Sequence, residues 1–81
     1  MTKNTLTFEL TRDGDELYIS CDRRGLTSFA LVIMKLLASE KKLPNDVSLS
    51  TEAWGGEGLS QNAQLVGGVL LNRVIVRLIE E

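Results

Sequence analysis

Two segments near the start of the chain alternate between apolar and polar residues, as half-buried strands do. Residues 5–12 and 15–21 show this pattern. The apolar positions are Leu6, Phe8 and Leu10 in the first segment, and Leu17, Ile19 and Cys21 in the second. Between the segments stands Asp13-Gly14, which is typical of a two-residue type I′ hairpin loop. The sequence therefore predicts a β-hairpin.

The loop also predicts the register of the hairpin. A two-residue loop at Asp13 and Gly14 places Arg12 opposite Asp15, which is a favourable charge pair. The next pairs on the same face are Leu10 with Leu17, Phe8 with Ile19, and Leu6 with Cys21. All three pairs are apolar, and a slip of one residue would break every one of them.

The spacing of the next apolar residues predicts a helix over 25–42. The expected core stripe consists of Leu26, Phe29, Ala30, Ile33, Leu36 and Leu37. Further apolar residues lie outside it, namely Leu31, Val32, Met34 and Ala38. The surplus at Leu31 and Met34 has two interpretations. Either these residues are covered by the loop after the third strand or simply exposed, or they form a surface for a dimer or another partner.

Polar residues and a proline predict the ends of this helix. Asp22 is the expected N-cap, with Thr27 or Ser28 as the alternative. The lysines at 41–42 are expected in the last turn, where cations suit the helix dipole. Pro44 disfavours helical backbone at the residue before it, so the helix is expected to end there.

The second half of the chain predicts two more strands, at 46–51 and 72–79. In the first of them Val47 and Leu49 are expected to point inward. The glycine-rich stretch 52–64 is expected to be a loop. Residues 65–71 are apolar but contain Gly67-Gly68, so a short strand, a bulge and a turn all remain open. Ile75 and Ile79 on the outer face of the last strand indicate a central strand, or one that is covered on both sides.

The predicted order is ββαββ, with room for one extra short strand. Strands grouped around one helix indicate a two-layer α+β sandwich, with one long helix on an antiparallel sheet. We expect a single α+β domain over residues 1–81. The last strand is expected to lie inside the sheet.

Composition narrows the classes of partner. The net charge is −2, and the nine basic residues are scattered, so nothing in the sequence would attract a phosphate backbone. The longest apolar run, 29–34, is far shorter than a membrane span. A single cysteine, Cys21, and a start without a signal-peptide pattern favour the cytoplasm. We therefore expect neither nucleic acid nor a membrane as partner.

Candidate chemistry is sparse. The chain has no histidine, which removes the commonest general base and the commonest ligand of transition metals. Glu52 and Glu57 are the one pair of carboxylates in a loop that could present them together. Residues 55–58 lack the ending of a P-loop and the full spacing of a dinucleotide fingerprint. We therefore expect no catalytic residue, no metal and no cofactor.

Trp54 is the only tryptophan, and it lies in the same loop. Its ring either covers an open end of the core or serves as a binding anchor, since tryptophan is enriched at hot spots of interfaces. In the second case Glu52 and Glu57 would add charge complementarity to a basic partner. The candidate partner-binding residues are therefore Glu52, Trp54 and Glu57.

Several stretches together resemble a known family. They are the hairpin with Arg24-Gly25-Leu26 and the leucine-rich helix up to Ala38, the short strand 46–49, the segment 55–60 and the closing strand 71–76. This arrangement resembles bacterial immunity protein family 32, small proteins encoded beside polymorphic toxins. The resemblance implies neutralisation of a cognate bacterial toxin by direct protein–protein binding. The alternatives are a structural module that forms a homodimer through the helix or the last strand, and an enzyme subunit with a site between protomers.

Overall fold

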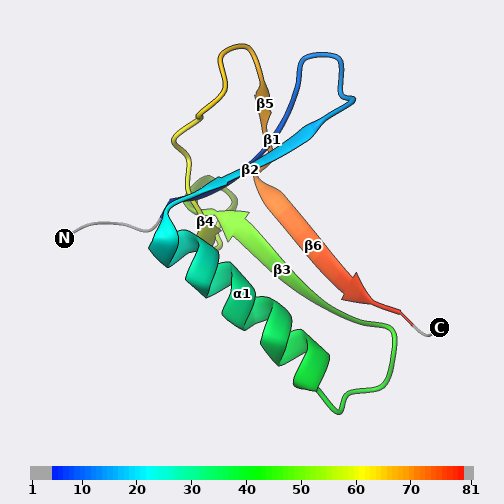
Figure 1. Ribbon diagram of the computed structural model, residues 1–81. Helices are drawn as coiled ribbons and strands as arrows, with labels where there is room; N and C mark the ends of the chain where they lie inside the picture. The colour runs from blue at the N-terminus through cyan, green and yellow to red at the C-terminus, as the bar shows by residue number, and fades with distance from the viewer. Residues whose placement is uncertain (1–4, 80–81) are drawn as a thin grey trace.

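The computed structural model describes residues 5–79, which form one helix and six strands (Figure 1). The elements are β1 (Leu6–Leu10), β2 (Leu17–Cys21), α1 (Arg23–Ala38), β3 (Asn45–Thr51), the 3-10 turn η1 (Glu52–Trp54), β4 (Gly58–Leu59), β5 (Val69–Leu70) and β6 (Arg73–Leu78). The α+β class is confirmed. The order is ββαββββ, with two short strands more than the basic pattern.

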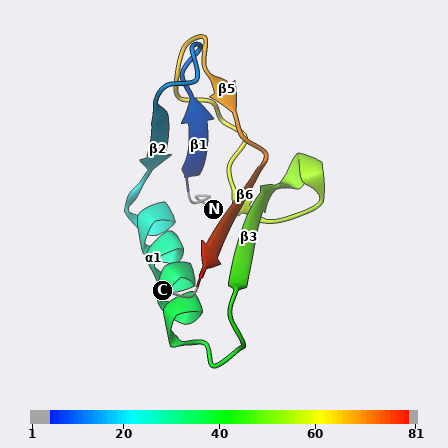
Figure 2. The ribbon, with the colours of Figure 1, turned by 90° about the vertical axis from the view of Figure 1, so that its right-hand side faces the viewer.

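The strands form two small sheets where the sequence predicted one antiparallel sheet. Their orders are β2-β1-β5 and β4-β3-β6. The pairing of β4 with β3 is parallel, and the other pairings are antiparallel. Figure 2 shows α1 beneath β2 on one side of the molecule and β3 on the other, so helix and strands make two layers.

The register of the hairpin is as predicted. Leu6 pairs with Cys21, Phe8 with Ile19 and Leu10 with Leu17. Both strands carry apolar residues at every second position, so this register places all six on one face, whereas a slip of one residue would not.

The hairpin loop differs from the predicted two-residue turn. A type I′ turn needs a positive φ at both central residues, and Asp13 has none, whereas Gly14 has a φ of +77°. The Gly14 amide bonds to the Thr11 carbonyl at 2.8 Å. The Asp13 carboxylate accepts from the Thr11 hydroxyl at 2.6 Å, and this bond lowers the pKa of Asp13. Arg12 and Asp15 therefore lie in a longer, exposed loop, without the predicted ion pair.

One stretch of chain joins the two sheets at the boundary between Leu71 and Asn72. The Leu71 amide bonds to the Phe8 carbonyl of β1, at 2.8 Å. At the next residue the partner changes to β3, because the Thr51 amide bonds to the Asn72 carbonyl at 2.9 Å. The Thr51 hydroxyl also bonds to the Asn72 side chain at 2.7 Å. The chain thus leaves one sheet and enters the other within two residues.

The core lies where the two sheets and the helix meet. Its buried members are Leu6 and Phe8 of β1, Leu49 of β3 and Leu59 of β4. The ring of Phe8 packs edge-on against Phe29 of α1, with 5.5 Å between the ring centroids. Leu49 points inward as predicted. Leu59 is a core residue that the sequence did not predict, because the glycines around it indicated a loop.

The helix is rotated about its axis relative to the prediction. The residues that are buried or pack against the core are Gly25, Phe29, Val32 and Leu36. Of the predicted stripe, Phe29 and Leu36 are among them, Ile33 is half-buried, and Leu26, Ala30 and Leu37 are exposed. A Cβ on Gly25 would lie 1.8 Å from the Thr5 carbonyl oxygen, so only glycine lets the helix approach β1 here. This contact selects which face of α1 is buried.

The N-terminus of α1 lies where it was predicted, but its C-terminus does not. Asp22 is the N-cap, and its carboxylate accepts from the Gly25 amide at 2.7 Å, which lowers the pKa of Asp22. At the other end the helix stops at Ala38, earlier than predicted. The Ser39 hydroxyl accepts from the Lys41 amide at 3.2 Å, and such local bonds compete with the helix. The lysines at 41–42 therefore lie outside the helix.

The last strand is at an edge, contrary to the prediction of a central strand. β3 is the middle strand of its sheet, and β6 pairs with β3 alone. Ile75 is 53% exposed and Ile79 is 64% exposed, so no layer covers the outer face of β6. The outer face of this sheet also carries the Asp46–Arg77 ion pair, with 2.9 Å between the charged atoms.

Candidate functional site

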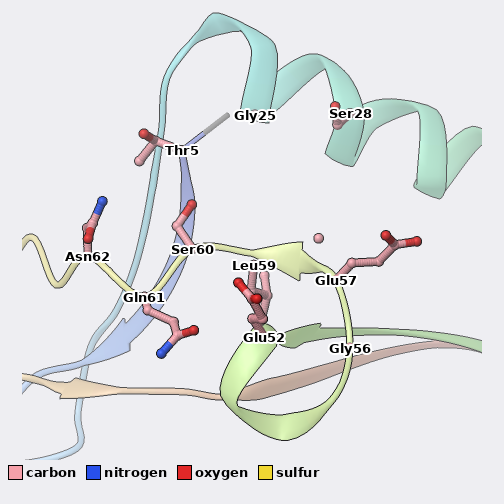
Figure 3. Close-up of a pocket in the computed structure, with 11 residues that line it drawn as sticks. Thr5, Gly25, Ser28, Glu52, Gly56, Glu57, Leu59, Ser60, Gln61 and Asn62 are labelled. Carbon is pink, nitrogen blue, oxygen red and sulfur yellow. The ribbon is translucent and has the colours of Figure 1, made fainter. Parts of the chain in front are cut away.

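A hollow of about 660 Å³ lies between the first turns of α1 and the segment 56–62 (Figure 3). Glu52 and Glu57 both line it, as the sequence predicted for residues of one loop. Figure 3 shows the Glu57 side chain extending away from Glu52, so the two carboxylates do not converge on one point. The two side chains therefore do not form a site in which paired carboxylates act together as acid and base.

The backbone that carries these residues is held tightly against β3. The Gly56 amide bonds to the Thr51 carbonyl at 3.2 Å, and the Ser50 amide bonds to the Glu57 carbonyl at 3.1 Å. A Cβ on Gly56 would lie 2.4 Å from the Ser50 Cβ, so the close approach needs glycine. Gly55 ends η1 with a φ of +75°, which favours glycine. The glycines therefore shape a fixed turn, and no phosphate-binding fingerprint is needed to account for them.

Trp54 lies outside the hollow and points its ring to solvent. Its side chain belongs to η1, and the residue is 63% exposed. This exposure contradicts the interpretation in which the ring covers the end of the core. The structure thus brings Glu52 and Glu57 to one hollow and leaves Trp54 on a neighbouring surface.

Among the described residues that line the hollow, the charged ones are Glu52 and Glu57, which are both acidic. Glu52 and Glu57 are both exposed. Within residues 5–79 the only ion pair joins Asp46 and Arg77. Neither glutamate therefore pairs with a lysine or arginine of this range. In the same part of the chain no three potential ligands gather into a metal site. The surface is therefore suited to contact with positive groups of another molecule.

One residue that sequence reasoning missed is Glu9. The alternation of apolar and polar residues placed it on the outer face of β1, yet it is completely buried. Its carboxylate accepts from the Gln64 amide at 2.9 Å and from the Leu65 amide at 3.2 Å. The Thr7 hydroxyl donates to it at 3.3 Å. Both faces of β1 are thus covered, and Glu9 anchors the segment 61–68, whose first two residues, Gln61 and Asn62, line the hollow.

The end of that segment carries a very exposed turn. Val66 is fully exposed, and Gly67 follows with a φ of +78°. No signal in the sequence distinguishes Glu9 from an ordinary surface residue of a strand, because the segment it binds lies more than fifty positions away. The turn itself was foreseeable from Gly67-Gly68.

No described helix is both long and apolar enough to cross a membrane. Comparison with known proteins gives no match, whether with family models, curated proteins or solved structures.

Proposed function

We propose that this chain is a protein-binding module without catalytic activity, which acts in the cytoplasm and holds a protein partner through Trp54 and the acidic residues beside it. The observation that carries the proposal is the 63% exposure of Trp54 on a turn fixed by backbone bonds. A large aromatic side chain that is exposed and already ordered loses little entropy on binding, which is why tryptophan is frequent at hot spots.

The character of the partner follows from the charge around the ring. Glu52 and Glu57 flank Trp54 in sequence, both are exposed, and neither forms an ion pair with a lysine or arginine of residues 5–79. A partner with lysines or arginines around an apolar pocket would complement this surface. The specific form of the proposal is neutralisation of a cognate bacterial toxin, which is what the resemblance to the immunity family implies.

The test uses the product of the neighbouring gene, if that gene ends in a toxin-like domain. Both proteins are purified, and their association is measured by calorimetry. We expect Trp54→Ala to weaken binding by about 2 kcal/mol or more, because the anchor of the interface is lost. Since the ring is exposed, the variant should unfold at nearly the same urea concentration as the parent chain.

A matched control is Tyr18→Ala, which removes another half-exposed aromatic ring, on β2. It should bind as the parent chain does. Equal losses in both variants, or normal binding by Trp54→Ala, would show that the contact lies elsewhere. Turnover of any substrate by the purified chain would contradict the non-enzymatic part of the proposal.

A further inference from the structure

The helix carries two apolar stripes, of which the fold buries one and leaves most of the other exposed. The packed stripe is 25-29-32-36, and next to it runs the outer stripe, which we define as Leu26, Ala30, Ile33 and Leu37. The two stripes are about 100° apart, since each residue of the outer one follows a residue of the packed one. Leu26 is 54% exposed and Leu37 is 73% exposed. Ala30 between them is also exposed, whereas Ile33 is half-buried and offers only part of its side chain.

Other apolar side chains are also exposed on the hairpin and on α1. Leu17 and Ile19 of β2 are about half exposed. Their register places them on the face of β1 and β2 that carries Phe8, and Phe8 contacts Phe29 of α1. The exposed part of that face therefore looks toward the side on which α1 lies. Met34, 62% exposed, borders the outer stripe on the helix itself.

The total surface is larger than a monomer of this mass should have. A folded monomer of 8.9 kDa has an accessible surface of roughly 4,800 Å², whereas this chain has 6350 Å². The six terminal residues outside the described range can account for at most roughly 900 Å² of the difference, the full surface of six unfolded residues. The remaining excess, at least roughly 600 Å², approaches the area of about 800 Å² that each partner buries in a standard interface.

The outer stripe is complementary to itself. A two-fold axis requires that residue i contacts residue j and that j contacts i. The spacing 4-3-4 reads the same in both directions, so two antiparallel copies place Leu26 opposite Leu37. They also place the small Ala30 opposite the large Ile33, which lets the helices approach closely. The antiparallel arrangement keeps the arginines at the start of the two helices far apart.

We propose that two copies of this chain associate through α1, with the outer stripes packed antiparallel about a two-fold axis between Ala30 and Ile33. This proposal does not depend on the proposed function, because Glu52, Trp54 and Glu57 lie outside α1 and none of them belongs to the outer stripe. The dimer would present two Trp54 turns to its surroundings.

Pairing through the last strand is disfavoured by charge. Two antiparallel β6 strands centred on Ile75 would place Arg73 of each copy opposite Arg77 of the other. Like charges directly opposite each other destabilise a strand pair. Charges on an edge strand are a usual device against such pairing.

The first experiment is sedimentation velocity on the full chain at micromolar concentrations. We expect a species of twice 8.9 kDa. Leu37→Glu should weaken association by about a hundredfold, because a carboxylate would be buried against Leu26 of the other copy. The matched control is Leu31→Glu, which adds the same charge to the same helix about 120° away from the middle of the outer stripe. The control should remain a dimer.

The second experiment keeps the proposal testable if Leu37→Glu fails to fold. Leu26→Cys and Leu37→Cys are made separately in a Cys21→Ala background and joined with a short bismaleimide. We expect linked dimers only when the two variants are mixed. Links within Leu26→Cys alone would refute the antiparallel register. A monomer at all concentrations, or equal loss of the dimer in Leu37→Glu and Leu31→Glu, would overturn the proposal itself.

Discussion

The buried carboxylate of Glu9 shows how one side chain can hold a long segment of backbone in place. It accepts from two amides of the segment 61–68, and that segment has little regular structure of its own. A buried amide that loses its partner costs about 1–3 kcal/mol, so the position of the segment depends on this residue. Gly25 acts by the opposite means, since there it is the lack of a side chain that permits contact with Thr5.

The first prediction concerns Glu9→Gln. The variant keeps one acceptor oxygen and places an NH₂ group against the amide of Gln64 or of Leu65. We expect a loss of about 1–3 kcal/mol in the free energy of unfolding, together with faster hydrogen exchange at these two amides. The measurements are urea unfolding and exchange followed by NMR.

The control is Glu16→Gln, which makes the same change at an exposed position of the same hairpin. It should alter stability by less than about 0.5 kcal/mol. Unchanged exchange at Gln64 and Leu65 in Glu9→Gln would mean that the segment is held by other contacts.

At the scale of elements, the placement of α1 decides which apolar surface is buried. The sequence allows two choices, because the stripes that begin at Gly25 and at Leu26 have the same spacing. The choice is made by the contact of Gly25 with Thr5, the residue just before β1, twenty positions away in the sequence. The helix and its N-cap could be predicted because capping and periodicity are local properties. Its rotation could not, because it depends on tertiary packing.

The second prediction tests this placement. Gly25→Ala would put a Cβ into the Thr5 carbonyl, so the helix must shift away from β1. We expect a loss of about 2 kcal/mol or more, even though alanine is the better helix former by about 1 kcal/mol. Thr27→Ala, an exposed site in the first turns of α1, should be neutral or slightly stabilising. Thermal unfolding followed by circular dichroism distinguishes the two, and a Gly25→Ala protein more stable than the parent would exclude the contact.

At the scale of the whole molecule, the two sheets share one core and one stretch of chain. Leu6 and Phe8 come from one sheet, Leu49 and Leu59 from the other, and the chain passes between the sheets at Leu71 and Asn72. The pairing within the hairpin could be predicted because its partners are close in sequence. The division into two sheets could not, because it depends on where β5 ends and β6 begins. The same holds for the candidate site, where the sequence predicted the loop of Glu52, Trp54 and Glu57 but not that the ring would lie outside the hollow.

The third prediction is that the two sheets unfold as one unit. Thr51→Val removes the hydroxyl that bonds to Asn72 and should cost about 1 kcal/mol. Because the core is shared, the amides of β1 and β3 should lose protection from hydrogen exchange by the same factor. Ser48→Ala, on the exposed face of β3, is the control and should change neither. Loss of protection in β3 alone would show that the sheets are independent.

The turn at Val66 and Gly67 lies at the opposite end of the molecule from the last turn of α1 (Figure 1). Its valine side chain is entirely in solvent, and a Cβ on Gly67 would meet no neighbouring atom. A group attached at Val66 would therefore not disturb the packing of the fold. A fluorophore coupled there through a cysteine would leave the aromatic anchor and the helix unmodified. In a Cys21→Ala background, energy transfer between two such dyes would then report on the association of two copies of the chain.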